Sequence, residues 1–272
     1  MMSNIFNIKR FGLIFRKDMM ENWKRYTLQF MAMIGIITVI TTYVSFSFFD
    51  DMIKYPGYYG EITKELGGYI IAMCFVFGAL FASTFMNPVN SKVKKISYLS
   101  NPASCLEKYF TRWLITTVGY IISFFIALCI AELLRVGICS AFYPDVDVEF
   151  ISIAEYKNEN EIVAAIIFIT SFYFLLQSLF ILGSTFWEKA TFVKTFSALI
   201  IFILLVIFAC RILIAVYYED FYSFERKLNS FMMKKTFSQI VFYFSLTFYF
   251  FAITNWVLTF FRLRESEIIK RL

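Results

Sequence analysis

The residue types in this chain exclude most catalytic and metal sites. Histidine is absent, which removes Ser-His and Cys-His nucleophile pairs and most zinc sites. The five cysteines show no paired spacing, so the sequence indicates no disulfide framework. No Gly-Lys pair occurs, so the chain lacks the glycine-rich phosphate loop of many ATPases. We therefore expect no catalytic residue, no cofactor and no metal.

The polar side chains that remain could form ion pairs or hydrogen bonds between helices. Glu132 and Arg135 are three residues apart near the end of one apolar stretch, and Arg211 ends another. Ionisable groups inside a membrane are functional candidates, so a Glu132–Arg211 contact is one hypothesis. Exposed anchoring at the membrane surface is the favoured interpretation. Gln177 and Asn255 are isolated amides, and for each we expect one interhelical hydrogen bond.

Six apolar, charge-free stretches must position these side chains. They cover residues 28–49, 66–87, 113–131, 162–185, 195–210 and 240–261. Most reach the ~20 residues that a helix needs to cross a ~30 Å hydrocarbon core, and the fifth is shortest because Lys194 and Arg211 bound it. Long basic side chains at such ends can extend to the interface. The prediction is an all-α, multi-pass membrane protein with six spans, forming one membrane domain over residues 1–272.

The charged residues between the stretches predict the orientation. With the N-terminus in the cytoplasm, the inner segments hold seventeen basic and six acidic residues, and the outer segments hold nine and fourteen. Cytoplasmic loops carry the excess of Lys and Arg in membrane proteins. We therefore expect both termini inside. The basic charge flanks membrane spans, which argues against nucleic acid as a partner.

The N-terminal segment, residues 1–27, has the pattern of an amphipathic helix. Apolar side chains recur every three or four residues at Ile8, Phe11, Phe15, Met19 and Trp23, with basic residues beside them. Such a helix lies in the membrane interface, with its apolar face among the acyl chains and its cations near anionic lipid. It could serve as an anchor alone, or also as part of a docking surface for a cytoplasmic partner.

The segment 88–112 leads into the third span. Asn101 has the character of an N-cap with Pro102 at the first helical position, and Glu107 lies early enough to favour the positive helix end. From Pro102 the helical pattern continues to about Arg135, or ~50 Å, which exceeds the hydrocarbon thickness. The third helix should therefore project into the cytoplasm, either as a lever for a partner or as a long helix with a basic anchor.

The run from Tyr98 to Trp113 resembles the cytoplasmic loop of bacterial ATP-binding-cassette permeases of the type-2 exporter class. In that class a Leu-x-x-Pro-Ala-Ser-x-x-Glu-Lys-aromatic pattern precedes the third span, and residues 99–109 match it. The resemblance extends in layout to the whole chain: a basic amphipathic N-terminal helix, six spans and a short charged tail. It is specific in residues only around 102–108.

This resemblance implies a permease half that pairs with a second half, identical or different, and with separate ATPase subunits. ATP hydrolysis would then occur in a partner chain. It also implies that the ATPase contacts the first cytoplasmic loop and the N-terminal helix, which assigns this role to Lys94, Lys95, Asn101, Pro102, Ser104, Glu107, Lys108, Arg16 and Lys17.

Two other classes of function are open on composition. A membrane scaffold or immunity-type protein without transport activity fits the same six spans. An intramembrane lipid-modifying enzyme or protease has less support, because the chain has no histidine, no clustered Asp motif and no Gly-x-Ser-x-Gly sequence. The leading hypothesis is a permease in the cell membrane, whose transported substrate the sequence does not specify.

Overall fold

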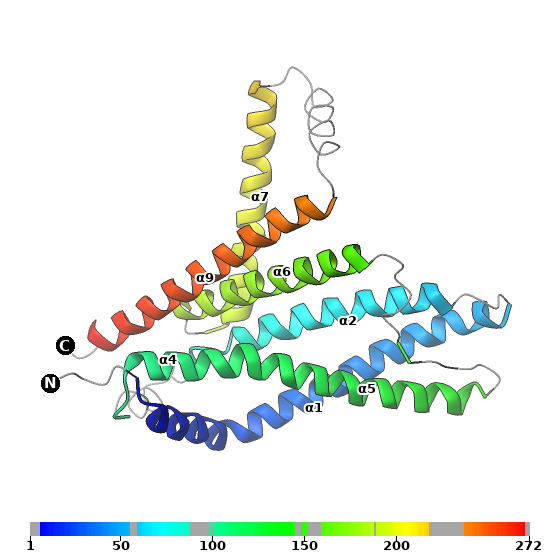
Figure 1. Ribbon diagram of the computed structural model, residues 1–272, viewed down its shortest axis with the longest axis horizontal. Coiled ribbons are helices and arrows are strands. Elements are labelled where there is room, and N and C mark those ends of the chain that lie inside the picture. The colour runs from blue at the N-terminus through cyan, green and yellow to red at the C-terminus, as the bar shows by residue number, and fades with distance from the viewer. Residues whose placement is uncertain are drawn as a thin grey trace. The chain divides into compact units, whose positions relative to one another are not determined.

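In the computed structural model, every regular element among the residues that can be described is a helix (Figure 1). The structure describes residues 6–54, 59–87, 98, 101–144, 148, 150–151, 159–187, 189–217 and 237–269. Within these residues, six helices are long and apolar enough to cross a membrane. The predicted fold class, an all-α multi-pass membrane protein, is confirmed, and the chain divides into two compact units.

The first unit contains the first three long helices. These are α1 (Ile8–Lys54), α2 (Tyr59–Ala82), and a third helix built from α4 (Cys105–Leu114), the π-helical turn η1 (Ile115–Gly119) and α5 (Tyr120–Phe142). The third helix runs for 38 residues without a break, or ~57 Å. The expectation that it is too long for the bilayer is confirmed, although it begins three residues later and ends seven residues later than predicted.

Helix α1 joins two segments that the sequence pattern treats separately. Residues 8–54 form one helix of 47 residues, with no break between the predicted interfacial segment 1–27 and the predicted span 28–49. No proline occurs in this range, so nothing interrupts the backbone hydrogen bonds. Figure 1 shows that the first turns of α1 run in a different direction from the rest. The position of these turns relative to a membrane stays a prediction.

The first and third long helices pack side by side and point the same way. Arg10 contacts Glu107, Asp18 contacts Arg112, and Ser45 contacts Arg135, so contacts advance together along both helices. Helices that cross a membrane in alternating directions require the first and third spans to be parallel. The packing therefore agrees with alternating crossings, and α2 returns between them with its Leu66 buried against Val44 of α1.

The second unit repeats this arrangement with α6 (Glu159–Phe186), α7 (Thr191–Tyr217) and α9 (Phe237–Ile269). Helices α6 and α9 are parallel, because Phe168 packs on Phe248 near their starts and Arg262 lies over Phe186 near their ends. The α6–α7 connection is close, since a Cβ at Gly183 would overlap Thr195. The glycine is needed for this approach.

Several helix boundaries differ from the predicted spans. Helix α2 ends at Ala82 and is followed by turns through Asn87, whereas the apolar stretch continues to residue 87. Helix α7 includes both Lys194 and Arg211, because a charged side chain at a span end does not end the helix itself. Helices α6 and α9 likewise extend beyond 162–185 and 240–261.

The predicted orientation can be measured by labelling at two exposed positions. Met20 and Phe142 are 64% and 71% exposed and lie at opposite ends of the first unit's parallel helices. In a chain without other cysteines, a membrane-impermeant maleimide added to intact cells should label Phe142→Cys and spare Met20→Cys. The charge distribution is the reason, because it holds the basic N-terminal segment inside. If Met20→Cys alone were labelled, the predicted orientation would be wrong and the N-terminal segment would lie outside the cell.

Candidate functional site

One buried carboxylate joins the starts of two helices. Glu107 is fully buried, and its Oε2 accepts the backbone N–H of Ser104 at 2.9 Å while Ser104 Oγ accepts the N–H of Glu107. Its Oε1 accepts the backbone N–H of Asn7 at 2.7 Å and a hydrogen bond from Arg10 Nη2 at 3.1 Å. Ser104 is the N-cap of α4, and Asn7 caps α1 through the N–H of Lys9.

The Glu107 carboxylate therefore completes the capping of both helices at once. The first turn of a helix leaves its N–H groups without partners and carries a partial positive charge. A single anion between two parallel N-termini satisfies both. Arg10 adds a charge-assisted hydrogen bond that offsets the cost of burying the carboxylate.

A second ion pair joins the same helices farther along. Arg112 Nη2 lies 2.7 Å from Asp18 Oδ1, and both side chains are about nine-tenths buried. Asn22 and Tyr26, one and two turns along α1, also donate to the Asp18 carboxylate, at 3.1 and 3.0 Å. The Asp18 carboxylate thus has partners on both helices. If α1 and α4 moved apart, its ion pair with Arg112 would break.

We call the contact between the starts of α1 and α4, built around Glu107 and the Asp18–Arg112 pair, the junction. Two predicted site residues meet at its edge. Lys17 Nζ donates to Asn101 Oδ1 at 2.9 Å and lies 3.6 Å from Glu21. Its side chain is 40% exposed, so these contacts are worth far less than the buried pairs. Arg16 and Pro102 are both exposed.

The structure corrects the predicted start of the third helix. Asn101 and Pro102 lie in a bend, and the N-cap is Ser104. Ser104 and Glu107 form a capping box, which satisfies two backbone donors reciprocally and therefore outcompetes the Asn-Pro start. The Ser-x-x-Glu spacing in the sequence is the signal that could have found it.

Glu107 and Lys108 are in the interior of the junction, with 0% and 4% of their surface exposed. A partner at this surface would meet their neighbours instead. Leu106 and Phe110 are 37% and 38% exposed, and Phe110 packs edge-on against Phe6, which precedes α1. Lys94 and Lys95 lie outside the described residues.

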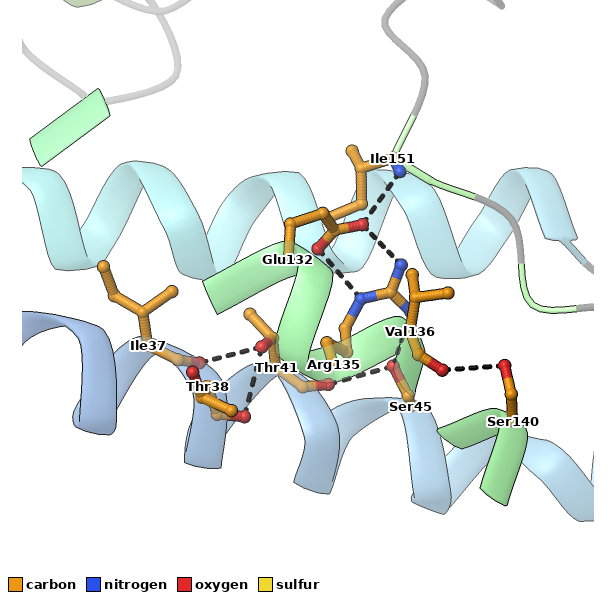
Figure 2. Close-up of polar contacts among 9 residues, drawn as sticks. All are labelled: Ile37, Thr38, Thr41, Ser45, Glu132, Arg135, Val136, Ser140 and Ile151. Carbon is orange, nitrogen blue, oxygen red and sulfur yellow. Dashed lines mark hydrogen bonds and ion pairs between the residues drawn. The ribbon is translucent and has the colours of Figure 1, made fainter. Parts of the chain in front are cut away.

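The second predicted polar group is also buried. Arg135 is 3% exposed and donates from Nε to Glu132 Oε2 at 2.9 Å and from Nη1 to Ser45 Oγ of α1 at 3.2 Å (Figure 2). Glu132 Oε1 also accepts the backbone N–H of Ile151. The interpretation of Arg135 as an exposed anchor is therefore wrong, because its pairing with the mostly buried Glu132 allows its charge to be buried. The bond to Ser45 is an interhelical polar contact, as one of the two interpretations expected.

The remaining predicted polar residues belong to the second unit. Asn255 of α9 donates to Ser178 Oγ of α6 at 3.1 Å, which confirms the interhelical bond expected of it. Gln177 is buried in α6 beside Ser178. Arg211 and Glu132 belong to separate compact units, so a contact between them stays a prediction.

The exposed part of the junction includes the apolar side chains of Leu106 and Phe110 and the basic side chains of Lys9 and Arg16. Sequence reasoning missed Asn7, Arg10, Asp18 and Arg112, whose partners are as far as 100 residues away along the chain. No protein-family model matches the chain, and no curated protein or solved structure matches it.

The Asp18–Arg112 pair should behave as a coupled unit in stability measurements. We expect Asp18→Asn and Arg112→Gln each to lower the free energy of unfolding by ~3–5 kcal/mol, since each leaves a buried charge unpaired. The double variant should lose clearly less than the sum of the two. Denaturant titration of the full chain in detergent micelles measures these changes.

Lys17→Gln is the matched control for this comparison of single and double variants. Its contacts are partly exposed, so its effect should stay within ~1 kcal/mol. Additive losses in the Asp18 and Arg112 variants would show that the two side chains do not depend on each other.

Proposed function

We propose that this chain is the membrane-spanning permease subunit of an ATP-driven exporter in the cell membrane. It would work with a separate ATPase chain and a second permease half, identical or different. The chain itself would hydrolyse no ATP. Its part would be to form the substrate pathway and to convert movement of the ATPase into movement of its own helices.

The capped junction of α1 and α4 is the observation that carries this proposal. It lies at the start of a helix of 38 residues, well over the ~20 needed to cross a membrane, so part of that helix must stand outside the hydrocarbon. Two ion pairs hold this part against α1: the buried Asp18–Arg112 pair, and the pair between the buried Glu107 and the partly exposed Arg10. A force applied to either helix there is passed to both.

The motif that resembles the exporter class supplies the side chains that cap the third helix at this junction. Ser104 and Glu107 of the Pro-Ala-Ser-x-x-Glu-Lys run make the capping box, and Glu107 reaches α1 as well. The motif would thus serve to fix the geometry of the docking surface. The exposed side chains beside it would make the contact with the ATPase.

The exposed side chains around the junction, which we call its rim, are apolar and basic, as expected of a surface that binds another protein. Phe6, Ile8, Leu106 and Phe110 are exposed there, and exposed apolar clusters on parts that stand outside the bilayer favour protein contact. Arg16 and Lys9 are exposed along the same stretch of α1, so an ATPase surface with an apolar groove and acidic margins would fit.

Co-purification tests the proposal directly. A phosphate-loop ATPase from a neighbouring gene should co-purify with the full chain, and Leu106→Glu with Phe110→Glu should weaken its binding at least tenfold, because each puts a charge into an apolar contact. The matched control, Leu106→Met with Phe110→Leu, keeps the apolar surface and should bind normally.

Phe110 also packs against Phe6, Phe11 and Trp113, so Leu106→Glu alone, which keeps these ring contacts, is tested beside the double variant and should also weaken binding. Equal binding by the glutamate and control variants would remove this rim as the docking surface. Failure of any such ATPase to bind the unmodified chain would favour the scaffold or immunity-type alternative.

A further inference from the structure

One exposed face of α1 combines cations with large apolar side chains. After the first, each member lies three or four residues beyond another, so together they form one line along the helix. Every member is exposed, and the three apolar side chains are more than half exposed. We call this face the basic stripe, and it consists of Lys9, Leu13, Arg16, Met20, Trp23 and Lys24.

The basic stripe lies on the opposite side of α1 from the contacts with α4. Asp18, which pairs with α4, is two residues from both Arg16 and Met20, and two residues make about half a turn of helix. Phe11, which the apolar pattern assigns to the membrane interface, packs on Phe110 of α4 instead. The face that α1 leaves open is therefore centred on the basic stripe.

The cations of the basic stripe have no acidic partner among the described residues of the chain. Nearer to α4, Arg10 is paired with Glu107. Lys17 likewise has Glu21 one turn farther along the helix. The stripe itself contains no acidic residue, and none of its three cations forms an ion pair with a described residue. It therefore presents three positive charges to its surroundings.

The basic stripe continues into a membrane span. Helix α1 has no break between the stripe and Lys54. Leu28 and Met31, in the turns after the stripe, are exposed apolar side chains, and such side chains at the start of a span lie among acyl chains. A surface that an unbroken helix joins to them lies close to the membrane.

The first turns of α1 run obliquely to the rest of the helix, as Figure 1 shows. From Asn7 to Asp18, the contacts of α1 pass only residues 107–112 of the third helix. From Asp18 to Ser45 they pass residues 112–135, which is nearly one residue for one. The start of α1 thus crosses its neighbour at an angle. A segment that turns away from the direction of the span can follow the membrane surface.

An anionic lipid surface satisfies both parts of the basic stripe. The stems of lysine and arginine extend their charges to the headgroups, while apolar neighbours enter the acyl boundary. Tryptophan is favoured at this level of a membrane. Each basic side chain near an anionic surface strengthens binding about fivefold, whereas a zwitterionic lipid offers it no net charge.

We propose that the basic stripe binds the headgroups of anionic phospholipids, with Leu13, Met20 and Trp23 among their acyl chains. The opposite side of α1 stays packed on α4, so the lipid contact holds the junction against the membrane surface. This contact belongs to the first unit and does not depend on the proposed ATPase.

The lipid contact extends beyond the surface proposed for the ATPase. Lys9 and Arg16 border the rim, so an ATPase there would share them with lipid. Trp23 and Lys24 lie about two turns beyond Arg16 and are left to lipid alone. Trp23 therefore reports the lipid contact whether or not an ATPase binds.

Quenching of Trp23 fluorescence by brominated lipids measures the contact. The full chain is reconstituted in equal mixtures of phosphatidylglycerol and phosphatidylcholine, with bromine on the acyl chains of one lipid or the other. The contribution of Trp23 is the difference between the parent chain and Trp23→Phe. Brominated phosphatidylglycerol should quench it at least threefold more strongly, because the neighbouring cations concentrate the anionic lipid.

Arg16→Gln with Lys24→Gln should bring the quenching by the two lipids close to equal, while Trp23 stays in contact with both. The two cations are exposed and form no ion pair with a described residue, so the fold does not depend on them. Lys189→Gln with Lys194→Gln is the matched control. It removes the same charge from exposed positions of the second unit and should keep the preference.

Equal quenching by both lipids in the parent chain, a full preference in the Arg16 and Lys24 variant, or an equal loss in the control would each overturn the lipid contact. So would the absence of quenching by either lipid, since Trp23 would then lie away from the membrane. Failure of the ATPase to co-purify in detergent would leave this result unchanged, so the two proposals fail separately.

Discussion

The hydrogen bonds from two helix starts to the buried Glu107 carboxylate determine how the first unit is assembled. Asn7 and Ser104 begin α1 and α4, and their N–H groups meet at one side chain. The shared anion brings the positive ends of both helices together, so the two helices start side by side. The Asp18–Arg112 pair then fixes their rotation about each other, because it admits one pairing of helix faces.

The same constraint explains why polar residues are found in so apolar a protein. In lipid, burial of apolar surface does not select which helices associate, so polar and aromatic contacts must do it. In the first unit the selection is made by ion pairs, and in the second by the Asn255–Ser178 bond together with aromatic packing of α6 on α9. In each unit the first helix packs in parallel with the third. Alternating crossings with short connections favour this pairing.

The apolar stretches predict the six spans because hydropathy is a local property, averaged over some twenty residues. The excess length of the third helix was predictable for the same reason, since no breaker follows Ser104 before the end of α5. The contacts of Glu107 with Asn7 and Arg10 were not predictable from the sequence. They join residues about 100 positions apart, and local patterns carry no information on such pairs. Burial of Arg135 was missed for a different reason. A charge near a span end suggests the interface, unless its partner on the same helix is taken into account.

That partner decides what the buried arginine can do. A charge paired across two helices holds them together, because separation would leave both charges unpaired in a medium of low dielectric. A charge paired within its own helix carries its counterion when the helix moves. Glu132 thus neutralises Arg135 within α5, while the guanidinium also donates a charge-assisted hydrogen bond to Ser45 of α1. Asp18 and Arg112 lie on different helices, so their charges neutralise each other only while α1 and α4 stay in contact. The position of the counterion, on the same helix or on the neighbouring one, therefore decides whether a buried charge holds two helices together.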